Sequence, residues 1–559
     1  MQAIVRKMMC AFLTLICVTA TALAVADGEI HGIVTDNAGK PIRGAMVKAT
    51  AGDKTVARFT QRDGRYQITV PAGSYEVSAD AYGLAAKRQT KDTAQAGETN
   101  FSLTPRFSMA RLTSAELESL LPDNQQTRLI RANCVACHSF GMIIMHRGYT
   151  AAEWQNFIPV MTRGRVPTPT LKDVLASPVK LATLSAALEK YFGPDAPYFG
   201  PDADPITPGQ IKHADVSDAV LSVTIREYAI PTADSFPHSV TLDDQDDAWF
   251  SELGPRANKI GRFDPVTEKF EEYPVPIPKA GPHTGAASAD GRYFWMTLTG
   301  AGIPAKLASV DRQSGKVTTY DFPGNDAHTH TLTLDAAGNV WCTGSTLLKF
   351  DVKTEEFQEY KMPVPPSYPE STVQAWTNTP GQPPDPFNAD DTVYDAKVDS
   401  KGNVWLSMQP LGLIIKLDPT TRETKTYHPP DTPSVKGMAV DAQDNIWFAG
   451  FQGNRLGSLN PKTGTFKLHQ APTGFATPYG LAFDKKTGYI WYADLNGNNI
   501  SRFDPKTEQF AEYPIPSSNA SPRFIALDSK GRVWFTEFMN GKIGVVDPGE
   551  ESKKVSSVR

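Results

Sequence analysis

The alternation of hydrophobic and polar residues divides the chain into three regions. In residues 27–105, apolar residues occupy every second position in short runs, and turns containing Gly, Pro or Asp separate the runs. In residues 106–200, helix-start patterns such as Thr113-x-x-Glu116 and Thr150-x-x-Glu153 precede apolar stretches. Strand-like runs return over residues 220–550 and repeat. The patterns predict a mainly β, multidomain chain with a β-sandwich, a small α-helical domain and a repetitive β domain.

The repetitive domain is organised around seven tryptophans, each of which follows a turn rich in Asp, Gly or Asn. They are Trp249, Trp295, Trp341, Trp405, Trp447, Trp491 and Trp534. Their spacing lies in the forties apart from one interval of 64 residues, where a Pro-rich insertion is expected to form a loop. Such a period predicts four-stranded blades, and seven tryptophans predict a seven-bladed β-propeller. Residues 226–231 carry the outer-strand motif before the first Trp, so we expect this strand to complete the last blade.

The N-terminal segment has the features of a targeting sequence. Arg6 and Lys7 precede an apolar stretch that ends in small residues near Ala26, which predicts a secretory signal peptide over residues 1–26 and a periplasmic protein. An uncleaved membrane anchor is the alternative. No later apolar stretch is long enough to cross a bilayer, so no membrane span is expected after signal removal. The net charge of −5 disfavours nucleic-acid binding.

The most specific motif lies in the helical region, at Cys134-Val-Ala-Cys137-His138. Two thiols with this spacing can each form a thioether to one haem, and the adjacent His138 can bind the iron as the proximal ligand. A zinc site would want four ligands, and a thioredoxin-like site would want a βαβ setting. We therefore expect one covalent haem c, with Met161 as the distal ligand and His146 as the next choice.

Helix-start patterns surround this motif. A further start is expected at Asp123-x-x-Gln126, and a last helix is expected over residues 184–192, ending at Gly193-Pro194. Together they predict a compact domain of three or four short helices. With its C-x-x-C-H motif, this region of about 90 residues resembles class I-like cytochrome c, which implies electron transfer.

The sandwich region resembles the carboxypeptidase regulatory-like domain. The resemblance rests on three turn motifs within residues 32–47, 63–66 and 73–77. It implies a transthyretin-like, carbohydrate-binding-like sandwich that serves as an accessory module. The motifs mark turns and carry no chemistry.

The propeller region resembles the virginiamycin B lyase (streptogramin lyase) family over about 330 residues. The resemblance rests on repeated motifs such as Gly402-Asn-Val-Trp405, Asn499-Ile-Ser-Arg-Phe-Asp-Pro505 and Glu272-Tyr-Pro274. It implies a seven-bladed propeller that opens a cyclic depsipeptide by elimination, using Mg²⁺ with His and Glu side chains near the axis. His328 stands where the family has Glu, which puts that activity in doubt, because Mg²⁺ prefers oxygen ligands and clustered imidazoles suit a transition metal.

A second set of candidate residues follows from the register of the repeats. Counting back 11 or 12 residues from each Trp gives the expected start of the innermost strand, near the mouth of the channel. These positions are His238, His283, His330, Tyr394, Lys436, Tyr479 and Arg523. All are polar or titratable, so we interpret them as a functional funnel; exposed side chains at loop ends are the alternative.

Roles for these positions follow from their chemistry. His238, His283, His328 and His330 are the candidate ligands of a divalent metal. His283, His330 and Tyr394 are the candidate catalytic residues, by analogy with the lyase pattern. Lys436, Tyr479 and Arg523 are expected to line the substrate funnel.

The sequence therefore favours a periplasmic monohaem electron-transfer protein whose propeller binds or oxidises a small-molecule substrate and which meets a redox partner protein. A lyase of the streptogramin type with an accessory haem domain is the first alternative. A non-catalytic protein that binds carbohydrate or a cell-envelope partner is the second. The sequence does not decide whether the protein is a haem-linked oxidoreductase, a lyase or no enzyme at all.

Overall fold

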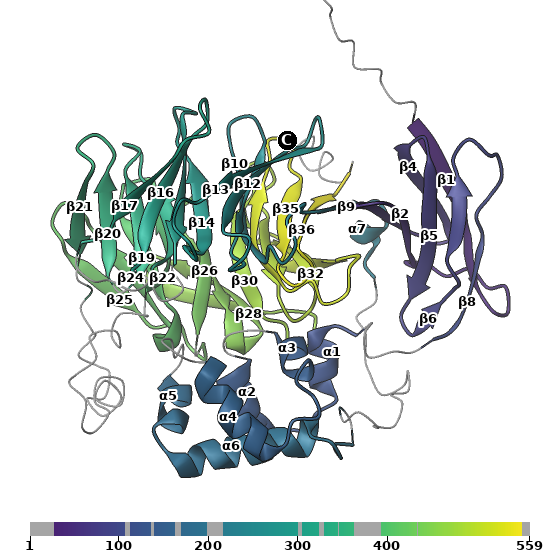
Figure 1. Cartoon of the computed structure of the whole chain (residues 1–559), viewed down its shortest axis with the longest axis horizontal. Coiled ribbons are helices and arrows are strands. Elements are labelled where there is room, and N and C mark those ends of the chain that lie inside the picture. The colour runs from purple at the N-terminus through teal and green to yellow at the C-terminus, as the bar shows by residue number, and fades with distance from the viewer. Residues whose placement is uncertain are drawn as a thin grey trace, which may run out of the picture.

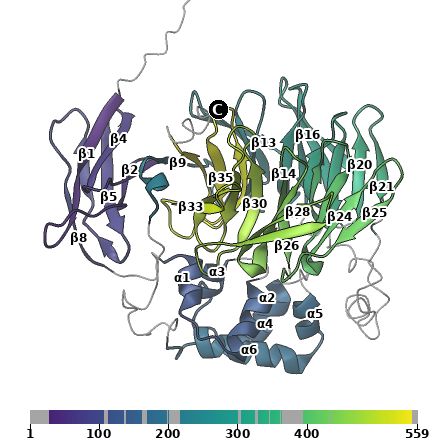
Figure 2. The ribbon, with the colours of Figure 1, turned by 180° about the vertical axis from the view of Figure 1, so that it is seen from behind.

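The computed structural model of the 559-residue chain describes residues 27–106, 112–135, 139–161, 169–197, 199, 216–299, 304–323, 329–344, 346–360, 362, 393–432 and 434–549. Two smaller parts adjoin the propeller: a β-sandwich lies beside it, and a layer of helices lies against one of its ends (Figure 1). The view from behind shows the same arrangement (Figure 2). None of the helices in these described ranges is long and apolar enough to cross a membrane. The expected signal peptide, residues 1–26, lies outside them.

The N-terminal part is the expected β-sandwich. Its strands are β1 (Asp27–Asp36), β2 (Met46–Ala51), β3 (Lys54–Phe59), β4 (Arg65–Pro71), β5 (Ser74–Ala81), β6 (Leu84–Ala85), β7 (Gln89–Asp92) and β8 (Phe101–Pro105). β1 pairs with β4 and β8, while β2 lies between β3 and β5. Burial alternates strictly along β4, as the period of two predicts. The inward residues, among them Ile30, Val47, Val77 and Phe101, form one core.

The propeller is built from sets of four strands. The innermost strands are β10 (Pro237–Leu242), β14 (Pro282–Ala287), β18 (Thr329–Leu334), β22 (Val393–Val398), β26 (Val435–Val440), β30 (Pro478–Phe483) and β34 (Pro522–Leu527). The second strands are β11 (Ala248–Glu252), β15 (Tyr293–Leu298), β19 (Val340–Gly344), β23 (Val404–Met408), β27 (Ile446–Gly450), β31 (Ile490–Asp494) and β35 (Val533–Glu537). The third strands are β12 (Lys259–Asp264), β16 (Lys306–Asp311), β20 (Leu347–Asp351), β24 (Leu413–Leu417), β28 (Arg455–Asn460), β32 (Asn499–Asp504) and β36 (Lys542–Asp547). The outer strands are β13 (Lys269–Pro274), β17 (Val317–Asp321), β21 (Glu356–Tyr360), β25 (Thr424–Tyr427), β29 (Thr465–Gln470), β33 (Gln509–Pro514) and β9 (Thr224–Ala229), and two 3₁₀ turns, η4 (Gln409–Leu411) and η5 (Phe451–Gly453), follow β23 and β27.

Six of these sets are separate four-stranded sheets, and the seventh belongs to a larger sheet. β34, β35 and β36 pair in the same order as the other sets, and β9 pairs with β36 as their outer strand. The other edge of β9 pairs with β3, so this set continues into the sandwich as part of a twelve-stranded sheet. The expectation of seven separate blades is therefore wrong: the described ranges contain six, and the seventh Trp repeat is fused to the sandwich. The expectation that the strand before the first Trp completes the last set is confirmed.

The fusion has a physical benefit, because β3 covers an edge that β9 would otherwise expose. Side chains reinforce it: Lys54 Nζ donates to Glu268 Oε2 at 2.6 Å, and Arg43 Nη2 donates to Asp218 Oδ1 at 2.7 Å. β3 reads as an ordinary amphipathic strand, so the sequence did not reveal this pairing.

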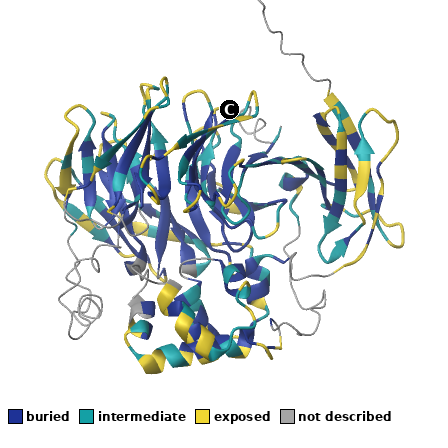
Figure 3. Ribbon diagram, in the orientation of Figure 1, coloured by how far each residue is buried: buried dark blue, intermediate teal, exposed yellow. Residues whose placement is uncertain are grey.

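One recurring hydrogen bond explains the Trp repeat. The indole Nε1 of Trp249 donates to Asp243 six residues earlier at 2.8 Å, and Trp405 does the same to Asp399 at 2.9 Å. The bond also occurs at Trp341, Trp447 and Trp534. It closes the turn between the first two strands, while the ring packs toward the next set, as Trp249 stacks on Phe294 with centroids 4.6 Å apart. The second strands, such as β11, β19 and β23, are buried at every residue, and the inner part of the propeller is mostly buried (Figure 3).

The helical part contains six helices. They are α1 (Ser114–Ser119), α2 (Gln125–Cys134), α3 (Phe140–Ile144), α4 (Ala151–Met161), α5 (Pro169–Leu175) and α6 (Pro178–Phe192), and a separate turn, α7 (Asp218–Leu221), leads into β9. Their apolar faces meet in one cluster that includes Ile130, Phe140, Leu188 and Phe192. This separate core confirms a small α-helical domain.

The structure confirms two of the three predicted helix starts and corrects the third by one residue. The capping boxes at Thr113/Glu116 and Thr150/Glu153 are confirmed. The third start is corrected by one residue: Asn124 Oδ1 accepts from Gln126 N and Thr127 N, because Asp123 pairs with Arg128 instead. The last helix is longer than expected and begins at Pro178 after the cap Ser177, since Pro fits the first helical turn. It ends before Gly193, as predicted.

Candidate functional site

The seven positions found by counting back from each Trp all lie at the same place in the fold. Each is the second residue of an innermost strand, and successive innermost strands contact one another around the axis. We call these seven residues the axial ring: His238, His283, His330, Tyr394, Lys436, Tyr479 and Arg523. In all seven strands the pairing shifts register at this residue. Such a bulge redirects a side chain out of the normal alternation, so the repeat itself builds the ring.

Three histidines of the ring form a close cluster. The candidate ligand atoms of His238, His283 and His330 lie within 4.8 Å of one another. The ring centroids of His238 and His283 are 3.7 Å apart, and those of His283 and His330 are 4.4 Å apart. The fourth candidate ligand, His328, lies outside the described residues. The geometry therefore brings together three of the four expected imidazoles.

The protonation of two of these histidines follows from their partners. His283 Nδ1 lies 2.8 Å from the carbonyl oxygen of His330, and His330 Nδ1 lies 2.9 Å from that of Tyr394. A carbonyl can only accept, so both Nδ1 atoms carry the proton. The lone pair of each ring is therefore on Nε2, the nitrogen that can bind a metal or take up a proton.

His238 differs from its neighbours. Ser239 Oγ, and not the His238 ring, donates to the His283 carbonyl at 2.6 Å. His238 Nδ1 is buried and has no hydrogen-bond partner among the described residues, and the side chain is only 1% exposed. Burial lowers the pKa of His238 well below its usual value, and the charges of His283 and Arg523 lower it further. His238 is therefore neutral at pH 7, which is the form that binds a metal.

The rest of the ring is aromatic and cationic. The Tyr394 ring lies 3.8 Å from that of His330, and burial raises the pKa of the Tyr394 phenol well above its usual value. Tyr479 OH lies 3.4 Å from His238 Nε2. Lys436 Nζ lies 3.5 Å from the centroid of the Phe451 ring, and Arg523 Cζ lies 3.9 Å from that of Phe538.

The histidine cluster fits some metal ions better than others. Three imidazole nitrogens so close together can share a transition-metal ion such as Zn²⁺, which binds nitrogen at about 2.0–2.1 Å. They do not fit Mg²⁺, which requires oxygen ligands, because no carboxylate belongs to the cluster among the residues described.

The helical domain docks on the end of the propeller where the axial ring lies. Asn496 follows β31 closely, and its N–H donates to Thr477 Oγ1, two residues before Tyr479. The same Asn496 accepts from two helices: its carbonyl oxygen from Ala115 N–H at 2.9 Å and its Oδ1 from Phe140 N–H at 3.1 Å. α1 and α3 are thereby fixed to the loops at this end.

A buried carboxyl completes the docking. Asn496 Nδ2 donates to Glu118 Oε2 at 3.1 Å, and Glu118 Oε1 pairs with Arg131 Nε at 3.0 Å. The Arg131 guanidinium lies over the ring of Phe475, 4.7 Å from its centroid. Burial raises the pKa of Glu118 to about 7, against the opposing effect of Arg131. The contacts of Asn496 and Phe475 with the helices could not be predicted from the sequence, since their partners lie hundreds of residues away.

The C-x-x-C-H motif is only partly described. Cys134 is half-buried at the end of α2 and packs against the apolar cluster of the helical domain. Cys137 and His138 lie outside the described residues, as does the side chain of Met161. Two other residues of this domain could supply a ligand: Met145 is 64% exposed, and His146 donates from Nδ1 to the Met142 carbonyl at 3.2 Å, which places the lone pair of its ring on Nε2.

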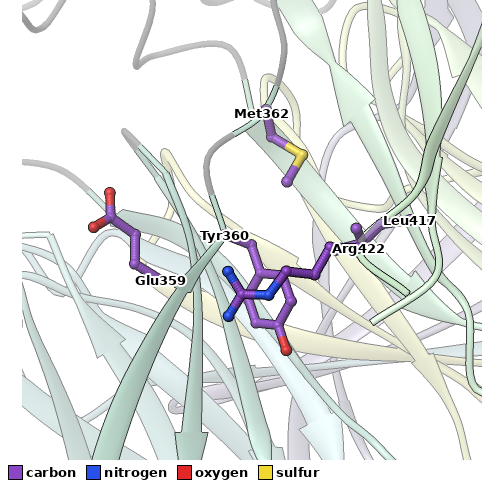
Figure 4. A pocket seen from close by; sticks show the side chains of 5 residues that line it. All are labelled: Glu359, Tyr360, Met362, Leu417 and Arg422. Carbon is purple, nitrogen blue, oxygen red and sulfur yellow. The ribbon is translucent and has the colours of Figure 1, made fainter. Parts of the chain in front are cut away.

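A separate surface pocket lies between two neighbouring sets of strands. It is lined by Glu359, Tyr360, Met362, Leu417 and Arg422 (Figure 4). The Arg422 guanidinium lies over the Tyr360 ring, 5.0 Å from its centroid. The pocket contains no axial-ring residue, so the candidate site is the ring.

Comparison with known proteins agrees with the β architecture. The carboxypeptidase regulatory-like domain model matches residues 29–105. Among solved structures, a streptogramin B lyase is 23% identical, with a TM-score of 0.50, and the match covers 59% of this chain and 99% of that one. The virginiamycin B lyase of Staphylococcus aureus is 21% identical, with a TM-score of 0.49, over 58% of this chain and 99% of that one. The first of these likenesses shows the propeller fold. No curated protein sequence matches the chain.

The family model gives the assignment. The model of the virginiamycin B lyase family matches residues 209–352 and 387–556. The matched residues include every position of the axial ring, whereas the helices α1–α6 lie outside both matched domains. Because this match extends over more than half of the sequence, the chain belongs to the virginiamycin B lyase family.

Proposed function

We propose that this is an exported oxidoreductase in which the axial ring binds a transition metal and a small substrate, and the helical domain carries a haem that exchanges electrons with that site. The observation that carries the proposal is the docking of α1 and α3 through Asn496 on the end of the propeller where the ring lies. A carrier held there would not need a diffusional encounter with the site for each electron.

The metal would be held by His238, His283 and His330. The carbonyl oxygens of His330 and Tyr394 orient the rings of His283 and His330 and place the lone pair of each ring on Nε2. Burial keeps His238 neutral, so no proton competes at that ring near pH 7. A bound transition metal would supply Lewis acidity or a one-electron redox step. Tyr394, a neutral phenol beside His330, would donate a hydrogen bond to the substrate.

The haem would be held by Cys134, Cys137 and His138, with Met161 as the distal ligand. Two buried polar atoms in this domain, Ser139 Oγ and Trp154 Nε1, have no partner among the described residues. Such atoms suit a polar group that the polypeptide does not supply, as the haem propionates would be. The position of the half-buried Cys134 at the end of α2, against the apolar cluster of the helical domain, also fits attachment. A bound haem would supply one-electron transfer.

The proposal is tested with protein exported to the periplasm of cells that mature c-type haem. The wild type should contain one iron as covalent haem and one further transition-metal ion per chain. His283→Ala should reduce the non-haem metal at least about tenfold while leaving the haem spectrum unchanged. The control is His469→Ala, since His469 stacks on Trp447 in the outer strand β29. Equal metal contents in the wild type and His283→Ala would contradict the metal site, and an absence of covalent haem would contradict the electron-transfer role.

A second candidate function is a lyase reaction with an accessory helical domain. The family match and the pairing of Tyr394 with His330 favour it, because elimination needs a base and a proton donor side by side. Incubation with a streptogramin B antibiotic distinguishes the two functions. Ring opening with the haem oxidation state unchanged would favour the lyase, whereas haem reduction by a substrate would favour the oxidoreductase.

A further inference from the structure

The axial ring is divided into an imidazole side and a cationic side. His238, His283 and His330 are consecutive, and Lys436 and Arg523 lie in the opposite run on either side of Tyr479. The Tyr479 ring centroid is 4.5 Å from Lys436 Nζ and 5.6 Å from Arg523 Cζ. Tyr479 OH is in turn 3.4 Å from His238 Nε2. Both cations therefore flank the tyrosine that contacts the histidine cluster.

No acidic residue belongs to the ring. Of the acids near the strand starts, Asp395 pairs with Lys397 at 2.7 Å, and Asp494 accepts from the N–H groups of Thr477 and Gly497. Glu252 and Glu537 pair with the strand starts at Pro237 and Pro522, and burial raises the pKa of Glu252 to about 8 and that of Glu537 well above its usual value, so both carboxyls are neutral at pH 7. Arg523 forms no ion pair with any of the described residues, and its buried Nε has no hydrogen-bond partner there. Arg523 is half-buried, and holding its charge there without a counter-charge is costly; a metal ion on the histidines would add further positive charge.

We propose that the axial ring binds an organic carboxylate or a comparable oxyanion, held by Arg523 and Lys436 on one side and facing the histidine cluster on the other. The substrate class of the site is therefore an organic anion. The guanidinium of arginine can hold a carboxylate with two parallel hydrogen bonds, and the Lys436 ammonium adds a second positive charge. This inference deepens the proposed function and rests on it for the site's catalytic role.

The surroundings of Arg523 and Lys436 are apolar, so the part of the ligand next to its charged group is expected to be apolar as well. Phe538 lies under Arg523, Phe451 lies under Lys436, and the Phe524 ring is 5.4 Å from that of His238. Aromatic side chains of this kind favour a ligand with a flat apolar body attached to its charged group. Benzoate has both features, and benzamide is its neutral counterpart of the same shape.

The test is calorimetric titration of the full-length protein with benzoate and with benzamide, in chloride-free buffer. Benzoate should bind at least about tenfold more tightly than benzamide, as expected for charge-assisted hydrogen bonds in a buried site. Arg523→Gln should remove most of this preference. The matched control is Arg502→Gln, because Arg502 also lies over aromatic rings, those of Tyr489 and Trp491, but outside the axial ring. The melting temperatures of both variants are measured to verify that they fold.

Titrations of metal-loaded and chelator-treated protein separate this inference from the proposed function. A benzoate preference that Arg523→Gln removes in both forms supports the anion site, even if no metal binds. A bound metal without any benzoate preference would overturn the anion site and leave the metal site standing. Equal loss in Arg502→Gln and Arg523→Gln, or no detectable binding of benzoate, would also overturn it.

Discussion

The strongest structural prediction concerns Asn496, the residue that fixes the helical domain to the propeller. Asn496→Ala keeps the main-chain bond to Ala115 but removes the side-chain bonds to Phe140 N–H and Glu118 Oε2, both 3.1 Å long. Phe140 and Glu118 are 0% and 3% exposed, so the two groups would be left buried with fewer partners. At about 1–3 kcal/mol for each unsatisfied group, the docking should weaken by roughly 2–4 kcal/mol.

Hydrogen exchange measures this weakening directly. A loss of that size raises the population of undocked molecules about 30- to 1000-fold, so amides of α1 and α3 should exchange faster by a similar factor. Amides of the inner strands should keep their protection. The control is Asn540→Ala, because Asn540 Nδ2 bonds Ser518 and Glu537 in the next set of strands and touches no helix partner. Unchanged exchange in α1 and α3 of Asn496→Ala would refute the docking described above.

Three further predictions test other parts of the structure. Burial raises the pKa of Glu118 from about 4.3 to about 7, so the docked state binds more protons than the undocked state. The wild type should therefore lose roughly 3 kcal/mol of stability relative to Glu118→Gln as the pH rises from about 4 through 7 in melting experiments. A difference that stays constant with pH would contradict this. Asp243→Ala should cost about 2–4 kcal/mol of unfolding free energy in denaturant titrations, more than Asp441→Ala, because it also removes one of the two carboxylates that pair with the buried Arg312 and leaves only Asp244; equal costs would contradict that pairing. Phe59→Ala in the sandwich should lower the melting temperature of the propeller as well, since Phe59 shares a core with Ile225 of β9; separate melting of the two would refute the shared sheet.

The axial ring could be predicted from the sequence because the repeat fixes its register. The bond from Trp249 to Asp243 recurs in five sets, so the distance from Trp to the innermost strand is nearly constant. Trp295 and Trp491 come one residue later relative to the ring, which is why the count back from Trp alternates between 11 and 12. Because the repeat is local, its spacing along the sequence predicts where each ring residue lies in the fold.

Contacts between the domains could not be predicted in this way. The pairing of β3 with β9 joins residues about 170 positions apart, and nothing in an amphipathic strand identifies its second neighbour. Asn496 reads as a turn residue, and its partners Phe140 and Glu118 belong to another domain. The one-residue shift from Asp123 to Asn124 has a similar cause, because Arg128 competes for the aspartate.

The different hydrogen-bond partners of the three clustered histidines could not be predicted from the sequence either. The sequence places His238, His283 and His330 in equivalent positions, yet their Nδ1 atoms have different partners. Ser239 replaces the His238 ring as the donor to the His283 carbonyl, so only His283 and His330 are oriented by the following strand. A hydroxyl residue follows each of the three histidines, at Ser239, Thr284 and Thr331, so the sequence did not indicate the difference.

The central claim is that the axial ring holds a metal at the end of the propeller where the helical domain docks. Anomalous diffraction from crystals of the exported protein, recorded at the edges of iron and of the metal found by elemental analysis, tests it most directly. We predict one peak about 2.1 Å from Nε2 of His283 and His330 and bonded to His238, and a second, iron peak next to Cys134. Crystals of metal-replete protein without a peak at the three histidines would contradict the claim.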